Sequence, residues 1–255
     1  MSDVLVIFLL FIVGAGVGSF LGVFVNQVIQ KRKQKRSYCD KCQHSLIWSD
    51  MVPILSYIVL GGKCRYCEEK INRKYFLMEI LVGCLFALSY IYLPINALEL
   101  ILWLAIVSVS MSLFLTDILY RKLPTRQIAV LTVFCLIFMF LTELLIEHKM
   151  YSAVVFEHIY SAIILTGLFS LTYIISAGKT IGFGDIMLSI PIAILLPWQG
   201  SLAVLFLASA LAILFYFPPI LRKKISANIK IPFGSFLIIS TLFVFFMMEL
   251  FVDLF

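Results

Sequence analysis

The chain has 255 residues, of which 62% are hydrophobic and only 13% are charged, and its formal net charge at pH 7 is +6. Soluble domains are about half apolar and about a quarter charged, so this chain has too few charges to cover the surface of a soluble globule. This balance excludes a cytosolic enzyme, a secreted disulfide scaffold and a disordered protein. The apolar runs are continuous and do not alternate with polar residues, which also excludes an outer-membrane barrel.

Eight apolar runs are interpreted as helices, and most of them are long enough to span a membrane. They cover residues 4–29, 76–93, 97–115, 127–146, 155–177, 186–197, 199–217 and 233–252. The sixth run is short, so we expect it to be buried among the others or to begin inside the Gly-Phe-Gly stretch before it. The sequence therefore predicts an all-α polytopic membrane protein with about eight helices in a lipid bilayer. We divide it into a first helix (1–29), a polar loop (30–75) and a seven-helix membrane domain (76–255).

Lysine and arginine residues lie almost entirely on one side of this arrangement. Eleven of the twenty basic residues lie in Lys31–Lys74, and the loops after the third, fifth and seventh helices bring that side to nineteen. Only Lys149 lies opposite. Because cytoplasmic loops carry the excess of Lys and Arg, this side is expected to be the cytoplasm, with both termini outside. Topology then explains the positive charge, and no nucleic-acid partner is expected.

The polar loop of residues 30–75 is too small to build a strong apolar core. It contains two CxxC pairs, Cys39 with Cys42 and Cys64 with Cys67, separated by twenty-one residues. This spacing fits four thiolates around one tetrahedral zinc ion, and disulfides are rare on the reducing side of the membrane. Four cysteines leave no open coordination position, so we expect a structural zinc whose binding stabilises the loop. The alternative is a redox pair or two unrelated turns.

Two aspartates lie at the ends of predicted helices. Asp117 ends the third run, and Asp185 opens the sixth, in the sequence Gly182-Phe183-Gly184-Asp185. By the charge topology, both lie at the cytoplasmic edge of the membrane, where an ionisable residue is costly and often functional. Each also has a simpler role: Asp117 could pair with Arg121 one helical turn on, and Asp185 could cap the helix that follows it.

As a pair, the two aspartates favour one kind of chemistry. Two carboxylates held close together cannot both ionise cheaply, so one keeps a proton. Such a pair can activate a water as a base and protonate a departing amine as an acid, as aspartyl proteases do. Gly182 and Gly184 leave the backbone before Asp185 open to an extended substrate segment.

The chain resembles the type 4 prepilin peptidases, or prepilin leader peptidase/N-methyltransferases. The resemblance rests on several motifs in the same order. They are Gly18-Ser19-Phe20-Leu21, the two cysteine pairs around Asp50–Tyr57, Arg73-Lys74-Tyr75 followed by Glu79 and Gly83, Asp117, Asp185, and Pro232-Phe233-Gly234. The chain departs from the usual family pattern at four sites: Gly22 replaces an Asn, Leu123-Pro124-Thr125 an Ile-Pro-Asn, Met187 a Lys and Ser235 a Pro.

The resemblance implies an intramembrane aspartyl endopeptidase of the bacterial inner (cytoplasmic) membrane, with Asp117 and Asp185 as its catalytic residues. Its substrates would be prepilins or pseudopilins of a pilus, secretion or DNA-uptake machine, cut where the basic leader meets an apolar helix. It also implies methylation of the new N-terminus with S-adenosylmethionine, and Glu79 is our candidate for contacting this cofactor or the incoming amine. The simpler role for Glu79 is an ion pair with Arg73 or Lys74.

Two other functions are weighed against this one. A polytopic transporter would use Asp117 and Asp185 as cation or proton carriers, but transporter sites tend to lie near the bilayer midplane between repeated halves, whereas these residues lie at helix ends. A non-catalytic scaffold would use the zinc loop to bind a partner. Replacing Asp185 by Asn separates the three functions, since a scaffold tolerates it, a carrier loses flux and a protease leaves its prepilin uncut.

Overall fold

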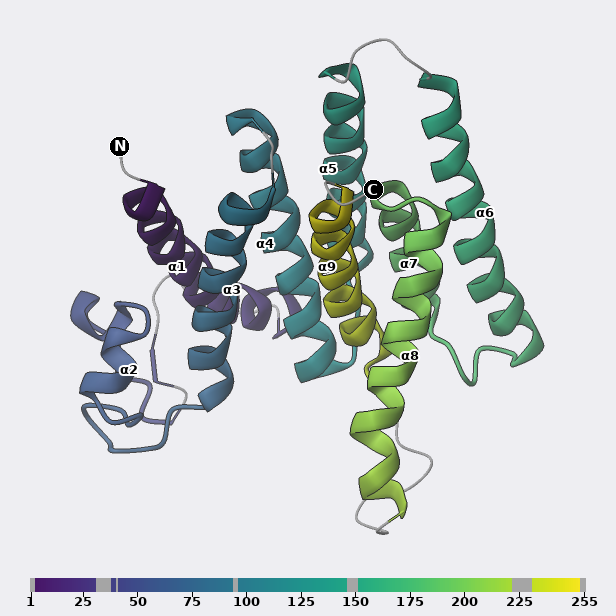
Figure 1. The fold of residues 1–255 in the computed structure, drawn as a ribbon. Coiled ribbons are helices and arrows are strands. Elements are labelled where there is room, and N and C mark those ends of the chain that lie inside the picture. The colour runs from purple at the N-terminus through teal and green to yellow at the C-terminus, as the bar shows by residue number, and fades with distance from the viewer. Residues whose placement is uncertain are drawn as a thin grey trace. The chain divides into compact units, whose positions relative to one another are not determined.

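The computed structural model describes residues 3–30, 38–39, 41–93, 96–145, 151–221 and 231–252, and regular structure within them is helical (Figure 1). The elements are α1 (Asp3–Gln30), the 3-10 turn η1 (Trp48–Met51), α2 (Leu55–Val59), α3 (Arg73–Tyr92), α4 (Ala97–Tyr120), α5 (Thr125–Leu145), α6 (Tyr151–Ile175), α7 (Phe183–Leu195), α8 (Trp198–Leu221) and α9 (Phe233–Val252). Of the residues that carry the charge topology, Lys31–Arg36, Lys149 and Arg222–Lys230 lie outside the described residues.

Seven helices of the described chain are long and apolar enough to cross a membrane, namely α1, α3, α4, α5, α6, α8 and α9. This confirms the all-α polytopic fold. The eighth apolar helix, α7, has 13 residues and spans about 20 Å at ~1.5 Å per residue, less than the ~30 Å of a bilayer core. It begins at Phe183, inside the Gly-Phe-Gly stretch, and packs against α5, α6, α8 and α9. The predicted count of eight is therefore reached only when this short helix is included.

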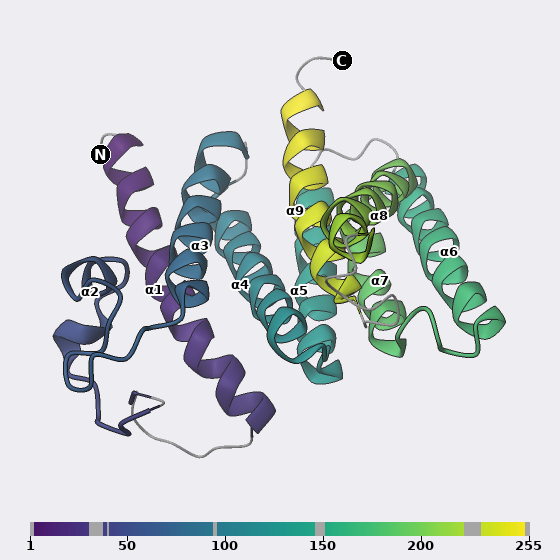
Figure 2. The same ribbon diagram turned by 90° about the horizontal axis from the view of Figure 1, so that it is seen from below.

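The chain divides into two compact units, Met1–Pro94 and Ile95–Phe255. In the first unit, α1 and α3 lie side by side (Figure 2), and the polar loop between them carries η1 and α2. The second unit holds α4 to α9. The division into three segments at residues 29 and 75 stays a prediction.

A stripe of glycines brings α1 and α3 into backbone contact. Gly14, Gly18 and Gly22 follow one another at intervals of four residues on α1. A Cβ added at Gly14 or Gly18 would lie 2.8 Å from a backbone oxygen of α3, and one added at Gly22 would lie 2.7 Å from the ring of Tyr75. Asn26, one turn further on, donates a hydrogen bond of 3.0 Å to the hydroxyl of Tyr75. Small residues spaced in this way let two helices approach closely in a membrane, so Gly22 fits this chain because Tyr75 occupies the space of a side chain.

Aromatic stacking and hydroxyl pairs join the helices of the second unit. Trp103 of α4 is fully buried and stacks on Phe245 of α9, with ring centroids 4.0 Å apart. Ser161 of α6 and Ser201 of α8 share a hydrogen bond of 2.6 Å. Interhelical hydrogen bonds of this kind stabilise helix association where lipid offers no polar partner. They fix the framework that carries the two aspartates.

Candidate active site and metal centre

Asp117 lies in the last turn of α4, with 5% of its surface exposed. The helix ends at Tyr120 because Arg121 adopts the left-handed conformation (φ 52°, ψ 42°), and its N–H donates to the carbonyl of Asp117. The side chain of Asp117 turns toward the start of α9. Its Oδ2 accepts a hydrogen bond of 2.7 Å from the backbone N–H of Ser235 and one of 2.8 Å from the hydroxyl of Ser235. Within the described part of the chain, no ion pair joins Asp117 to Arg121.

Asp185 is the third residue of α7. Its Oδ2 accepts a hydrogen bond of 3.1 Å from the backbone N–H of Gly182, so it caps its own helix. A carboxylate in the first turn of a helix also interacts favourably with the helix dipole. This hydrogen bond uses Oδ2 of Asp185, and the other carboxylate oxygen, Oδ1, takes no part in the cap.

Gly234 lies between the two carboxyl groups. A Cβ added to Gly234 would lie 3.2 Å from Oδ2 of Asp117 and 3.3 Å from Oδ1 of Asp185. The structure therefore brings Asp117 and Asp185 together around the start of α9, although 68 positions separate them in the sequence. The motif Pro232-Phe233-Gly234 was noted in the sequence, but its place between the aspartates was not predicted.

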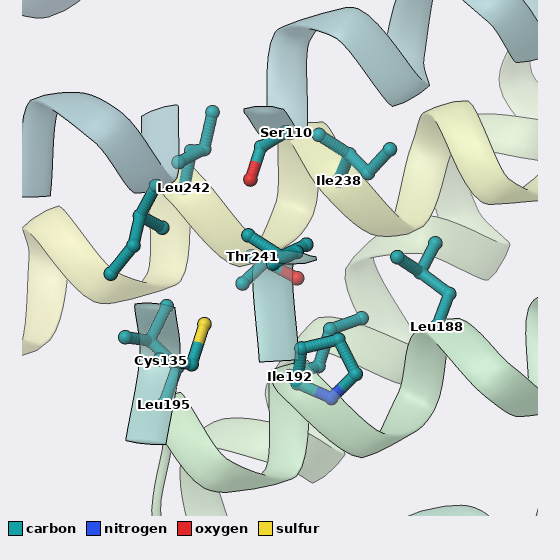
Figure 3. A pocket seen from close by; sticks show the side chains of 11 residues that line it. Ser110, Cys135, Leu188, Ile192, Leu195, Ile238, Thr241 and Leu242 are labelled. Carbon is teal, nitrogen blue, oxygen red and sulfur yellow. The ribbon is translucent and has the colours of Figure 1, made fainter. Parts of the chain in front are cut away.

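A small cavity lies deeper in the same unit, among side chains of α4, α5, α7 and α9 (Figure 3). Its volume of about 20 Å³ has room for roughly one water molecule. The hydroxyl of Thr241 faces it but donates to the carbonyl of Leu237. The other lining residues are Ile106, Ser110, Leu131, Cys135, Leu188, Pro191, Ile192, Leu195, Ile238 and Leu242. A space this small and this apolar cannot hold a peptide segment, so it adds no substrate site to the pair of aspartates.

The four cysteines of the polar loop lie together and could hold a metal. The Sγ atoms of Cys39, Cys42, Cys64 and Cys67 are all within 4.8 Å of one another, and those of Cys39 and Cys67 are 3.7 Å apart. Tetrahedral zinc with Zn–S bonds of about 2.3 Å needs sulfur atoms about 3.8 Å apart. A hydrogen bond from the backbone N–H of Cys42 lowers the pKa of the Cys39 thiol to about 7, whereas burial and the neighbouring thiols raise the pKa of the Cys67 thiol to about 12. A metal bound by all four sulfur atoms would therefore have to displace the proton of Cys67.

The segments that carry the two cysteine pairs share two backbone features among their described residues. In each segment, the N–H of the first cysteine donates to the carbonyl five residues on, at 3.0 Å in the first and 2.8 Å in the second. The residue four positions after that cysteine has a positive φ, 58° in the first and 54° in the second. An ion pair between Lys41 and Glu69 joins the segments. The aligned strings YCDKCQHS and KCRYCEEK carry this short repeat, which we did not predict.

Glu79 lies on α3 and is buried, with 8% of its surface exposed. Its Oε2 accepts a hydrogen bond of 2.7 Å from the backbone N–H of Ile54, at the start of α2. Ile54 has φ 64° and ψ −54°, a conformation that β-branched residues rarely adopt. Among the described side chains, no ion pair joins Glu79 to Arg73 or Lys74. Glu79 therefore ties the polar loop to α3.

Two family models match the chain. The Bacterial Peptidase A24 N-terminal domain matches residues 12–93, and the Type IV leader peptidase family matches residues 100–217. The chain belongs to the type 4 prepilin peptidase family. The first match contains the four cysteines and Glu79, and the second contains Asp117 and Asp185. The resemblance drawn from the motifs is confirmed.

Several curated relatives carry the name prepilin leader peptidase/N-methyltransferase. The relative from Vibrio cholerae serotype O1 is 29% identical, over 92% of this chain and 95% of that protein. The relative from Klebsiella pneumoniae is 26% identical, over 80% of this chain and 90% of that protein. A shorter match to the Bacillus subtilis relative is 34% identical over 36% of each chain. No solved structure matches this chain. This member of the type 4 prepilin peptidase family is an enzyme, which sets aside the transporter and scaffold functions.

Proposed function

We propose that this enzyme removes the leader of prepilins or pseudopilins by an aspartyl mechanism, with Asp117 and Asp185 as its catalytic pair. The observation that carries the proposal is the position of Gly234 between the two carboxyl groups. A Cβ added to this glycine would lie within 3.3 Å of one carboxylate oxygen from each aspartate. One carboxylate would take a proton from a water, whose oxygen attacks the scissile carbonyl. The other carboxyl would give its proton to the amine that leaves when the C–N bond breaks.

The location of the pair supports a cut at the membrane edge. Asp117 is in the last turn of an apolar helix that could span a membrane, and Arg121 and Lys122 follow it. Because basic residues gather on the cytoplasmic side, the proposed arrangement has the pair at the cytoplasmic face and both termini outside. A substrate with a basic leader and an apolar helix would then present its junction at the depth of the pair.

The relatives' names include a second activity, and we assign it to the first unit. The enzyme would methylate the new N-terminus with S-adenosylmethionine, and Glu79 would contact the cofactor or the amine. The four cysteines would hold a structural zinc, which the closeness of their four sulfur atoms supports. A closed four-thiolate site leaves the metal no position for a substrate, so the zinc would stabilise the loop and take no part in cleavage.

Asp117→Asn and Asp185→Asn test the catalytic pair, with Glu99→Gln as the matched control. Glu99 is a buried acid of the same helix α4, but it caps the opposite end of that helix. Each Asn variant should lower the rate of leader removal from a purified prepilin by about 100-fold or more, whereas Glu99→Gln should cleave like the parent. Mass spectrometry of the pilin measures the cut, and thermal unfolding shows that the variants are folded. Near-parental cleavage by either folded Asn variant would exclude the proposed mechanism.

A further inference from the structure

The start of α9 directs two hydrogen-bond donors at one oxygen of Asp117. Ser235 is the third residue of α9, and the first four N–H groups of a helix have no partner inside that helix. The N–H of Ser235 donates instead to Oδ2 of Asp117, at 2.7 Å, and its hydroxyl donates to the same oxygen, at 2.8 Å. Only 3% of the surface of Ser235 is exposed, so little water competes for these bonds.

The hydroxyl of Ser235 has a choice of acceptor, and its distances favour Asp117. The carbonyl oxygen of Phe114 is 3.5 Å from the hydroxyl oxygen, compared with 2.8 Å for Oδ2 of Asp117. A hydroxyl has one proton to donate, and bonds to a carboxylate are shorter and stronger than bonds to a neutral carbonyl. The proton of the hydroxyl is therefore assigned to Asp117.

The two oxygens of the Asp117 carboxyl group are consequently unlike. A carboxylate oxygen has about two lone-pair positions, and the two donors of Ser235 fill those of Oδ2. Oδ1 receives neither of these hydrogen bonds from Ser235. The torsion of the carboxyl group is also fixed, because two donors from one residue hold a single oxygen.

We infer that Ser235 is a positioning residue of the peptidase reaction. It holds Oδ2 of Asp117 as an acceptor and so fixes the orientation of this carboxyl group beside Gly234 and Asp185. This inference rests on the proposed function of the aspartate pair. A proline at this position would carry neither of the two donors, since it has no N–H and no hydroxyl. In this chain, Ser235 adds both.

Three substitutions of Ser235 separate its two donors. Ser235→Ala removes the hydroxyl and keeps the N–H, Ser235→Pro removes both, and Ser235→Thr keeps both. A proline is tolerated in the first turn of a helix. The matched control is Ser240→Ala, because Ser240 is a fully buried serine of the same helix whose hydroxyl has no hydrogen-bond partner in the described part of the chain.

The measurements are kcat, KM and the pH dependence of kcat, on variants shown by thermal unfolding to be folded. Ser235→Ala should lose roughly ten- to a hundredfold in kcat with little change in KM, as expected for the loss of one hydrogen bond to a charged group. Ser235→Pro should lose more, and Ser235→Thr should restore most of the rate. The pH profile should be displaced in Ser235→Ala and unchanged in Ser240→Ala.

Two results would overturn the inference. In one, folded Ser235→Ala keeps the parental kcat and pH profile. In the other, Ser240→Ala loses as much activity as Ser235→Ala, which would mean that the loss reflects the packing of α9. Either result leaves the aspartate pair untouched, since Asp117→Asn tests that pair separately. If Ser235→Pro fails to fold, the comparison of Ser235→Ala with Ser235→Thr still tests the inference.

Discussion

Leu123 lies directly against Gly184, the residue that precedes Asp185. A Cβ added at Gly184 would lie 2.9 Å from the Cβ of Leu123, and one added at Gly234 would lie 2.8 Å from the Cδ1 of the same leucine. One side chain from the connection after α4 therefore contacts the starts of both α7 and α9. The leucine and the two glycines set how closely the helices that carry the site approach one another.

Gly234→Ala should impair cleavage, because its methyl group would meet Leu123 and both carboxylates. Contacts of 2.8 to 3.3 Å force the neighbours to move, and such overpacking typically costs about 1–3 kcal/mol. We expect kcat to fall by tenfold or more. The matched control is Gly167→Ala on α6, which has no heavy atom within 4 Å of the added Cβ and should cleave like the parent. Parental kcat in Gly234→Ala would contradict the close approach.

Truncating Leu123 should relieve the close contact of an added methyl group at Gly234 but not the one at Gly184. Leu123→Ala removes the Cδ1 that meets an added methyl at Gly234, but it keeps the Cβ that meets one at Gly184. The double variant Gly234→Ala/Leu123→Ala should therefore be more active than Gly234→Ala, whereas Leu123→Ala should not rescue Gly184→Ala. A double-mutant cycle of kcat and of unfolding temperature measures both couplings. Equal rescue at the two glycines would show that the contacts differ from those described.

The glycine stripe of α1 predicts a stability difference between neighbouring positions. At Gly18, an added Cβ would lie 2.8 Å from the carbonyl oxygen of Met78 and 2.9 Å from the Cα of Glu79, and backbone atoms cannot rotate away. Gly18→Ala should therefore lower the free energy of unfolding by about 1–3 kcal/mol, and the unfolding temperature should fall with it. Gly16→Ala is the control, because nothing lies within 4 Å of its added Cβ and alanine favours a helix more than glycine does. Equal effects at the two positions would contradict the α1–α3 contact.

Local patterns in the sequence predicted the elements of this enzyme better than the contacts between them. Continuous apolar runs predicted the helices, and CxxC spacing predicted the cysteine cluster, because both signals depend on nearby residues. The bond from Ser235 to Asp117 joins positions 118 residues apart, and no periodicity carries such a pairing. The glycine stripe and the repeat of residues 38–45 in 63–70 do have sequence signals, namely a spacing of four and an eight-residue alignment, which we did not use.

The cysteine cluster predicts about one zinc ion per chain. Metal analysis of the purified enzyme should find it, and Cys39→Ser or Cys64→Ser should lose it and lower the unfolding temperature, since binding of the metal contributes folding energy to a small loop. Cys84→Ser is the control, because Cys84 is an exposed residue of α3 outside the cluster. A metal-free parent together with Ser variants of parental stability would contradict the prediction.

Glu79→Gln should separate leader cleavage from methylation of the new N-terminus. Glutamine keeps an oxygen that can accept the 2.7 Å hydrogen bond from Ile54, so the loop should stay attached to α3, but it removes the negative charge that would hold an ammonium group or accept its proton. We therefore expect Glu79→Gln to cut the leader at the parental rate and to leave the new N-terminus unmethylated in the presence of S-adenosylmethionine. Glu79→Ala removes the acceptor as well, and it should also lower the unfolding temperature because the N–H of Ile54 loses its partner.

Mass spectrometry of the processed N-terminus distinguishes the products. A methylated product from Glu79→Gln would leave Glu79 with its structural role alone, and an unmethylated product from the parent would mean that this enzyme is a peptidase without the second activity.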